Sequence, residues 1–400
     1  MSGKAIEHSK REHALLSASG ASRWLNCTPS AMLEEQFGVK TTSIFAEEGT
    51  LAHEISELYI RHDVIGTCTD DDFQNTMAGF ISNELYKDEM LDYIQTYVDY
   101  CAAQYNDRKT NGKSAVIEIE QKLDLTDYVP ESFGTADCVI ISDGTMEVID
   151  FKYGKGVPVY ATWNKQLMLY GIGAFMKYSL IYDITSVHLS IVQPRLNNIS
   201  TWEISVDELF DWANNDLKKR AEDAFNGRGE LASGDWCKFC SVKARCKKLY
   251  DDSLEVAKSE FATGQKEIKL LSDDEVSDVL RKAPIIIDYL ESVKEYAQKQ
   301  ATDNDKHWPG FKLVAGRSQR KWIDAEAAMD AIAKRHPECQ IEELFDVKPK
   351  TITDIEKMFG KTTFNDEFSD LVIKPDGAPT LVPEDDKRPA INQAFEDFKH

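Results

Sequence analysis

Two neighbouring segments of this sequence carry charged residues that are suited to chemistry. The segment FGTAD ends at Asp137, and the segment EVIDFKYGKG contains Asp150 and Lys152. Both have the apolar pattern of strands, and the turn signal at 142–144 between them predicts an antiparallel pair. Because side chains alternate along a strand, Asp150 and Lys152 point to the same face. Two carboxylates and a lysine at one edge of a sheet form a site for a hard cation such as Mg²⁺.

Such a site suits the hydrolysis of a phosphodiester. A bound metal lowers the pKa of its water and polarises a phosphoryl oxygen, while a nearby lysine can orient that water and stabilise the transition state. The plainer interpretation of a bare Asp-x-Lys is a surface ion pair, which is common and weak. The context favours the site, since Asp150 follows the apolar Met146, Val148 and Ile149 and emerges from a buried strand. An unpaired charge is costly there.

Three further residues fit the same site. Gln166 and Tyr170 are four positions apart in a predicted helix and share a face of it. His53 lies in an upstream helix and could supply a neutral imidazole ligand. Each also has a structural interpretation, as helix surface or core-edge residues for the pair and as a packed histidine for His53. The order and spacing of these pieces together favour the functional interpretation, with Glu48 a weaker candidate in the same helix as His53.

A second set of residues with metal chemistry lies downstream. Cys237, Cys240 and Cys246 crowd into the segment WCKFCSVKARC. A fourth ligand is needed, because four-cysteine sites are the rule for both zinc and iron–sulfur centres. Spacing alone does not choose between them, although zinc knuckles more often show two CxxC pairs and only one is present. The alternative is three free cysteines beside a basic helix end. The other cysteines without a partner at metal spacing are Cys68, Cys101, Cys138 and Cys339.

The elements that position these residues follow from the spacing of apolar residues. Helical spacing occurs within 14–60 and again at 90–105. The other predicted elements, in chain order, are strands at 115–123, 133–142 and 146–154, a helix at 163–178, strands at 186–194 and 199–206, and a helix at 206–225. This order predicts an α/β fold with a mixed central sheet flanked by helices. A smaller, mainly helical region is expected at the C-terminal end.

Four parts of the chain are predicted from these elements and from composition: an N-terminal arm at 1–14, a domain at 15–258 that holds both sites, a C-terminal α+β region at 259–362, and a tail at 363–400. A capping box from Ser272 to Glu275 opens a long helix in the third part, and Pro284 would kink it. The polar, Pro- and Asp-rich composition of the tail predicts disorder.

A predicted strand pair in the C-terminal region, at 310–316 and 320–324, combines basic and aromatic residues. Arg317, Arg320 and Lys321 could contact a nucleic-acid backbone while the aromatics stack on bases. The plainer interpretation is a solvated hairpin that packs its aromatics inward. We favour the plainer one, because few basic residues are involved.

Composition limits the class of protein. The net charge of −22 counts against tight, nonspecific binding of nucleic acid, but it does not exclude a local site. No apolar run reaches the roughly 18 residues that a membrane span needs, and the N-terminus lacks the apolar segment of a secretory signal. We therefore expect a soluble, cytoplasmic protein without membrane contact.

The segments GTLAHE, GTAD, VIDFKYGKG and QLMLY together resemble the RecB-like branch of the PD-(D/E)XK nucleases, over residues 15–250. The resemblance implies a restriction-endonuclease-like core and a bound Mg²⁺ or Mn²⁺. The metal ligands that it implies are His53, Asp137, Asp150 and the main-chain carbonyl of Phe151. It also implies a catalytic Lys152 and DNA positioning by Gln166 and Tyr170. Ala136 precedes Asp137 where the formal motif has proline, a variation that this branch tolerates.

The same resemblance suggests a fourth cysteine ligand. In iron–sulfur members of this branch, one cysteine lies upstream of the nuclease core and three lie downstream. Cys27 matches the upstream position, so the implied ligands are Cys27, Cys237, Cys240 and Cys246. A [4Fe–4S] cluster is the implied occupant, with zinc the less favoured one. Its implied role is structural or in DNA binding.

The sequence as a whole leads us to expect a metal-dependent deoxyribonuclease similar to phage- or prophage-encoded RecB-like nucleases. It would act on DNA ends or single strands in recombination, replication or repair, in a bacterial or phage-infected cell. DNA is the expected partner, with a helicase, a single-strand-binding protein or an annealing protein as candidate companions. Two alternatives stay open: a catalytically silent DNA-binding module and a zinc-stapled interaction protein. The intact set of Asp137, Asp150 and Lys152 argues against the first.

Overall fold

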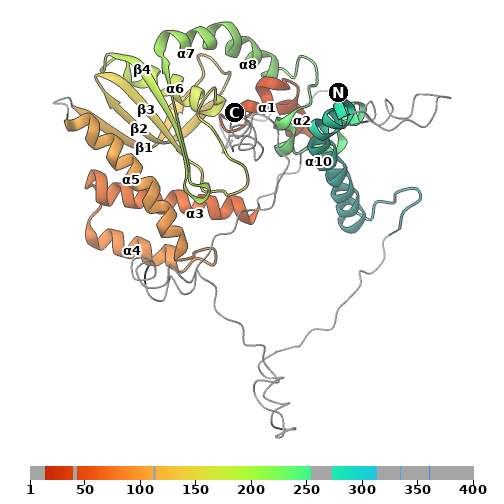
Figure 1. The fold of residues 1–400 in the computed structure, drawn as a ribbon, viewed down its shortest axis with the longest axis horizontal. Coiled ribbons are helices and arrows are strands. Elements are labelled where there is room, and N and C mark those ends of the chain that lie inside the picture. The colour runs from red at the N-terminus through yellow and green to blue at the C-terminus, as the bar shows by residue number, and fades with distance from the viewer. Residues whose placement is uncertain are drawn as a thin grey trace, which may run out of the picture. The chain divides into compact units, whose positions relative to one another are not determined.

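Five strands form one mixed sheet in the order β1-β2-β3-β4-β5. Their bounds are Ala115–Asp124 (β1), Phe133–Ser142 (β2), Gly144–Phe151 (β3), Ile184–Gln193 (β4) and Asn198–Ser205 (β5). The first three strands are antiparallel neighbours, β3 and β4 are parallel, and β4 and β5 are antiparallel. Helix α6 (Lys165–Tyr178) makes the crossover that the parallel pair requires (Figure 1). The predicted mixed α/β fold is confirmed.

This sheet belongs to a computed structural model that describes residues 14–38, 43–110, 114–253 and 273–312, with residues 334 and 360 beyond them. The chain divides into two compact units, Met1–Gln300 and Ala301–His400, and the sheet lies in the first. The predicted basic strand pair with Arg317, Arg320 and Lys321, the tail at 363–400 and all but the last residue of the N-terminal arm lie outside the described residues. So does Ser272 of the predicted capping box.

Helices cover both faces of the sheet (Figure 1). On one face, α6 packs with three other helices into one core: α1 (Ala21–Asn26), α7 (Val206–Trp212) and α8 (Lys218–Phe225). On the other face a second core forms with α3 (Ile44–Tyr59), α4 (Asp70–Ile81) and α5 (Glu89–Thr110). Strand β3 is buried on both sides: Val148 enters the first core, and Ile149 and Phe151 enter the second. This alternation explains its nearly continuous apolar sequence.

Short helices complete the first unit. Helix α2 (Ser30–Phe37) follows α1, and π-helical turns extend α3 and separate α7 from α8, at η2 (Ile60–Ile65) and η4 (Ala213–Leu217). The 3-10 turns are η3 (Pro194–Leu196), η5 (Asp235–Phe239) and η6 (Lys243–Arg245). The long helix α10 spans Asp273–Asp303 and continues through Pro284. Its Tyr289 packs with Cys237 and Leu249.

Helix α6 approaches the sheet closely because two glycines leave room for it. A Cβ atom at Gly173 of α6 would lie 2.9 Å from the Cβ of Leu123, and a Cβ at Gly134 of β2 would lie 2.6 Å from the Tyr170 ring. Since such contacts are too short, neither position accepts a side chain without movement of α6. The glycines therefore fix the distance between the sheet and the polar residues of α6.

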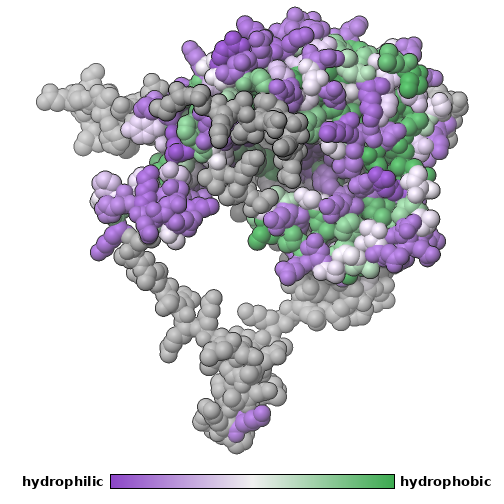
Figure 2. Space-filling model, turned by 180° about the vertical axis from the view of Figure 1, so that it is seen from behind, coloured by the Kyte–Doolittle hydropathy of each residue, from purple (hydrophilic) through white to green (hydrophobic). Residues whose placement is uncertain are grey.

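Hydrophilic and hydrophobic residues mix on the face of the molecule that Figure 2 shows. Such a mixed surface is usual for globular proteins. None of the helices in the described ranges is both long enough and apolar enough to cross a bilayer.

Candidate functional site

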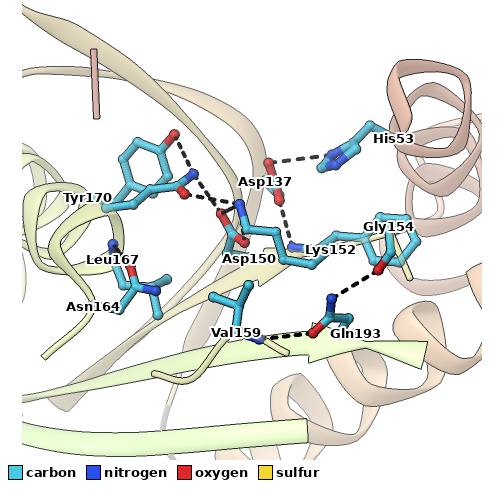
Figure 3. Close-up of polar contacts among 12 residues, drawn as sticks. His53, Asp137, Asp150, Lys152, Gly154, Val159, Asn164, Leu167, Tyr170 and Gln193 are labelled. Atoms are coloured by element: carbon cyan, nitrogen blue, oxygen red, sulfur yellow. Dashed lines mark hydrogen bonds and ion pairs between the residues drawn. The ribbon is translucent and has the colours of Figure 1, made fainter. Parts of the chain in front are cut away.

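Asp137 lies at the centre of the candidate site. It precedes Cys138, which pairs with Ile149 of β3, so Asp137 is next to the end of that strand. One carboxylate oxygen, Oδ2, accepts a hydrogen bond from the Phe151 main-chain amide at 2.7 Å, and Oδ1 lies 3.5 Å from Nδ1 of His53. Burial raises the pKa of Asp137 to about 6, while His53 opposes this shift. Figure 3 shows Asp137 between His53 and the Asp150–Lys152 pair.

Glu120 of β1 joins this group through an unusual backbone conformation. Its φ of 48° is in the left-handed region, which is rare for a residue other than glycine. The β1–β2 ladder pairs Ile119 with Cys138 and Gln121 with Ala136, and it skips Glu120 and Asp137. Burial and the charge of Asp137 raise the pKa of the Glu120 carboxyl to about 7. Such strain costs about 1–3 kcal/mol and is typical of functional sites.

His53, Glu120 and Asp137 form a group that can hold a metal ion. Each offers one ligand atom, and these atoms all lie within 4.8 Å of one another. Around an octahedral ion with ligands at about 2.1 Å, adjacent ligand atoms are about 3 Å apart and opposite ones about 4.2 Å. The 3.5 Å between His53 and Asp137 lies between these values. A small closing movement would bring all three side chains onto one ion.

Sequence reasoning did not identify Glu120. In the segment AVIEIEQKL, Glu118 and Glu120 alternate with the apolar Ile117 and Ile119, which is the pattern of a strand face turned to solvent. Nothing in that alternation signals that the backbone of Glu120 departs from the regular pleat. Glu120 can be identified as a candidate ligand only from the structure, where its carboxylate lies close to His53 and Asp137.

The ring of Phe151 and the helix that carries His53 position the imidazole. Phe151 stacks on Tyr97 with ring centroids 4.4 Å apart, and its centroid lies 5.2 Å from that of His53. Five residues before His53 in the same helix, the buried Glu48 lies 3.5 Å from Lys87 and 3.6 Å from Arg195. Glu48 therefore ties α3 to neighbouring elements and is outside the metal group. The main-chain amide of Phe151 donates to Asp137, and a ligand role for its carbonyl stays a prediction.

Asp150, Lys152, Gln166 and Tyr170 form a polar network beside the metal group (Figure 3). The Lys152 ammonium lies 2.9 Å from Oδ2 of Asp150 and donates to Oε1 of Gln166 at 3.0 Å. The Gln166 amide nitrogen lies 2.8 Å from Oδ1 of Asp150 and 3.2 Å from the Tyr170 hydroxyl. The structure thus brings together the four side chains that the sequence placed on β3 and on the following helix.

The network keeps Lys152 charged and leaves Asp150 partly unsatisfied. Burial lowers the pKa of Lys152, but the carboxylates of Asp150 and Asp137 outweigh burial and raise it above its ordinary value. Asp150 is only 2% exposed, and its Oδ2 makes no hydrogen bond although the ammonium lies close. A buried carboxylate oxygen with spare acceptor capacity is suited to a cation. Asp150 therefore stays a candidate ligand beside the three-residue group.

A protein-family comparison decides what the chain is related to. The model of a family described as "Protein of unknown function (DUF2800)" matches residues 13–389. The chain belongs to the DUF2800 family. A solved structure titled "Crystal structure of SSO0001" is similar at 15% identity over 55% of this chain and 94% of its own, with a TM-score of 0.23. That TM-score supports no conclusion about fold or function.

Four cysteines of this DUF2800 chain come together from distant segments. Cys27 ends α1, Cys237 lies in η5, and Cys240 and Cys246 follow η5 and η6 directly. Burial raises the pKa of both Cys27 and Cys237, and the nearby Cys246 raises each further. Burial raises the pKa of Cys240 to about 12. Cys246 is close enough to Cys27 and Cys237 to raise the pKa of both thiols. A bound cation would stabilise the thiolate forms, so the four cysteines are a candidate metal centre.

Helices α1 and α2 hold the cysteine segment in place. Glu34 of α2 pairs with Arg23 of α1 at 2.5 Å and accepts hydrogen bonds from the amide and hydroxyl of Ser241, at 2.7 and 3.0 Å. Arg23 also donates to the Phe239 carbonyl. The predicted fourth ligand, Cys27, is therefore anchored next to the three downstream cysteines.

A cleft of about 1180 Å³ connects the two candidate centres. Lys152 and Gln166 line it near the metal group, and Cys237 lines it near the cysteines. Segments of α1, of the loop before α6, of η5 and of α10 contribute the remaining walls. One continuous cleft of the DUF2800 chain therefore passes both sites.

Proposed function

We propose that this chain is a Mg²⁺- or Mn²⁺-dependent deoxyribonuclease. One observation carries the proposal: the metal group of His53, Glu120 and Asp137 lies beside the buried Asp150–Lys152 pair. Carboxylates and one imidazole form a divalent-cation site, and an adjacent ammonium suits a reaction in which negative charge accumulates. Phosphodiester hydrolysis is such a reaction. The resemblance of the surrounding segments to RecB-like nucleases supports the same conclusion.

In this proposal one set of residues binds the metal and Lys152 stabilises negative charge. A divalent ion held by His53, Glu120, Asp137 and Asp150 would supply a water of lowered pKa and would polarise a phosphoryl oxygen. Although burial lowers the pKa of Lys152, the carboxylates of Asp150 and Asp137 raise it above its ordinary value. Its ammonium would orient the attacking water and stabilise charge on the phosphate. Gln166 fixes the position of Lys152 through the 3.0 Å hydrogen bond.

We also propose that Cys27, Cys237, Cys240 and Cys246 hold a [4Fe–4S] cluster. The arrangement of one cysteine upstream of the core and three downstream resembles that of iron–sulfur members of the RecB-like nucleases, and this resemblance favours a [4Fe–4S] cluster over zinc. Its role would be to tie α1 to η5 and η6 along the cleft.

The test of the nuclease proposal is a cleavage assay on linear and single-stranded DNA with Mg²⁺ or Mn²⁺. Anaerobically purified wild type is expected to cleave, and Asp150→Asn is expected to lose activity by about 100-fold or more, because metal binding and the Lys152 partner are both damaged. The matched control is Asp127→Asn, an exposed aspartate between β1 and β2, which should cleave like wild type. Cleavage that survives in Asp150→Asn would overturn the proposed site. A wild type that binds DNA without cleaving it would favour the silent binding module.

A further inference from the structure

The loop between Lys152 and α6 is held in one conformation by buried amides. Gln193 at the end of β4 is 2% exposed, accepts a hydrogen bond from the Val159 amide at 3.1 Å and donates to the Gly154 carbonyl at 2.9 Å (Figure 3). Asn198 of β5 donates to the Val159 carbonyl at 2.8 Å, and Ser200 accepts from the Ala161 amide at 3.0 Å. The sheet therefore supports the loop along its length.

This supported loop presents Trp163 to solvent in a strained conformation. Trp163 precedes Asn164, the residue that caps α6, and its φ of 55° is in the left-handed region. For a bulky side chain this backbone conformation is an outlier. The indole packs against Trp202, with centroids 5.0 Å apart, and lies under the Lys165 ammonium at 5.3 Å. Nevertheless, 48% of the residue is exposed.

Trp163 borders the cleft together with cationic and aromatic side chains. The cleft is lined by Lys152 and Gln166 of the candidate site, and by Arg23, Lys165, Lys238 and Phe239. Phe239 is 74% exposed, and the Lys238 ammonium lies 5.8 Å from its ring centroid. Three acidic residues also line the cleft, Asp235 of η5 and Asp288 and Glu291 of α10, and Asp288 is paired with Lys243 at 2.8 Å. Exposed aromatics interleaved with cations are the pattern of surfaces that bind single-stranded nucleic acid.

We propose that Trp163 is a stacking platform for an unpaired base of a single-stranded DNA substrate. The base would stack on the open indole while its backbone follows the cations of the cleft toward Lys152. This inference rests on the proposed nuclease function and narrows its substrate to single strands. In a duplex every base is paired and all but the terminal pairs are stacked on both faces, whereas an unpaired strand offers open base faces along its whole length. Trp163 would therefore favour single strands over duplexes.

The experiment measures binding without catalysis, so that it is independent of the nuclease proposal. Full-length protein in EDTA is titrated into a labelled oligothymidylate and into a blunt duplex, while anisotropy and tryptophan fluorescence are followed. The informative pair of variants is Trp163→Leu, which keeps apolar bulk against Trp202 but has no aromatic face, and Trp163→Phe, which keeps a face. The control is Phe45→Ala, an exposed aromatic residue (80%) of α3 outside the cleft.

The proposal predicts a specific pattern of affinities. Wild type binds the single strand more tightly than the duplex, and Trp163→Leu weakens single-strand binding about 10-fold while leaving duplex binding unchanged. Trp163→Phe keeps most of the affinity, and its tryptophan quenching is smaller than in wild type, because Trp236 of the same cleft remains. Phe45→Ala binds like wild type. Wild-type affinity of Trp163→Leu for the single strand, or an equal loss on both probes, overturns the stacking role. Absence of cleavage with intact, Trp163-dependent binding would reject the nuclease proposal alone.

Discussion

At the residue scale, the candidate metal group depends on a carboxylate that leaves the regular pleat of β1. The left-handed conformation of Glu120 brings its side chain to His53 and Asp137. Burial, and after it the neighbouring carboxylates, raise the pKa values of Glu120 and Asp137, and a bound cation would stabilise both carboxylates. Binding of a divalent ion would explain both the strained backbone of Glu120 and the closeness of its carboxylate to that of Asp137.

Replacing Glu120 with glutamine tests this interpretation. The amide keeps the size of the side chain but is a poorer ligand, so the affinity for Mn²⁺ should fall by about 10-fold or more. Isothermal titration calorimetry measures it. The matched control is Glu118→Gln on the same strand, whose side chain accepts from Gln121 at 3.2 Å and is outside the metal group. Equal Mn²⁺ affinity in Glu120→Gln and wild type would show that Glu120 is not a ligand.

The sequence predicts most of the residues of this site but not all. Asp137, Asp150 and Lys152 could be found because strand alternation and an antiparallel turn place them at one edge. Gln166 follows from helical spacing. Glu120 could not be found, because a single φ value decides its orientation and no periodicity encodes it.

At the element scale, turns and helix ends create the cysteine centre. Cys27, Cys240 and Cys246 each follow the last residue of a short helix, where the chain changes direction. The spacing of the three downstream cysteines therefore reflects two successive 3-10 turns. Cys27, which follows α1, could be proposed as the fourth ligand only from a family resemblance. Residue spacing gives no information about cysteines as far apart in the sequence as Cys27 and Cys237.

Substituting Cys27 tests the cluster at this scale. Anaerobically purified wild type is expected to be brown and to contain iron and sulfide, whereas Cys27→Ala should lose most of both and unfold at a lower temperature, because α1 is no longer tied to η5. Elemental analysis and thermal unfolding measure these effects. Cys68→Ala, a cysteine in the other core, is the control and should retain its iron. Stoichiometric zinc without iron in wild type would contradict the cluster.

The secondary structure follows the sequence well where apolar periodicity is strong. The predicted strands and the helix at 163–178 agree with β1 to β5 and α6 within a few residues. The helical region at 14–60 divides into three helices, and the helix at 206–225 is interrupted by a π-helical turn. Helix α4 was not predicted, since it buries only Met77 and its periodicity is correspondingly weak.

At the scale of the whole molecule, four segments far apart in the sequence form one cleft. They carry Arg23, Lys152, Cys237 and Asp288, and the cleft reaches from the catalytic candidates to the cysteines. Sequence patterns describe one helix or strand at a time, so they do not reveal that these four segments line one cleft. Despite the net charge of −22, four basic residues (Arg23, Lys152, Lys165 and Lys238) line this cleft beside three acidic ones, and the proposed DNA strand would meet these cations.

The central claim is that metal binding and Lys152 act together on a phosphodiester. The most direct measurement is the cleavage rate of linear single-stranded DNA by Lys152→Gln, made alongside Mn²⁺ titration of the same protein. Glutamine can still hydrogen-bond Asp150 but carries no charge. We predict that cleavage falls by about 100-fold while Mn²⁺ affinity stays within a few-fold of wild type. Cleavage at the wild-type rate by this variant, or no cleavage by a wild type that has bound Mn²⁺, would contradict the account.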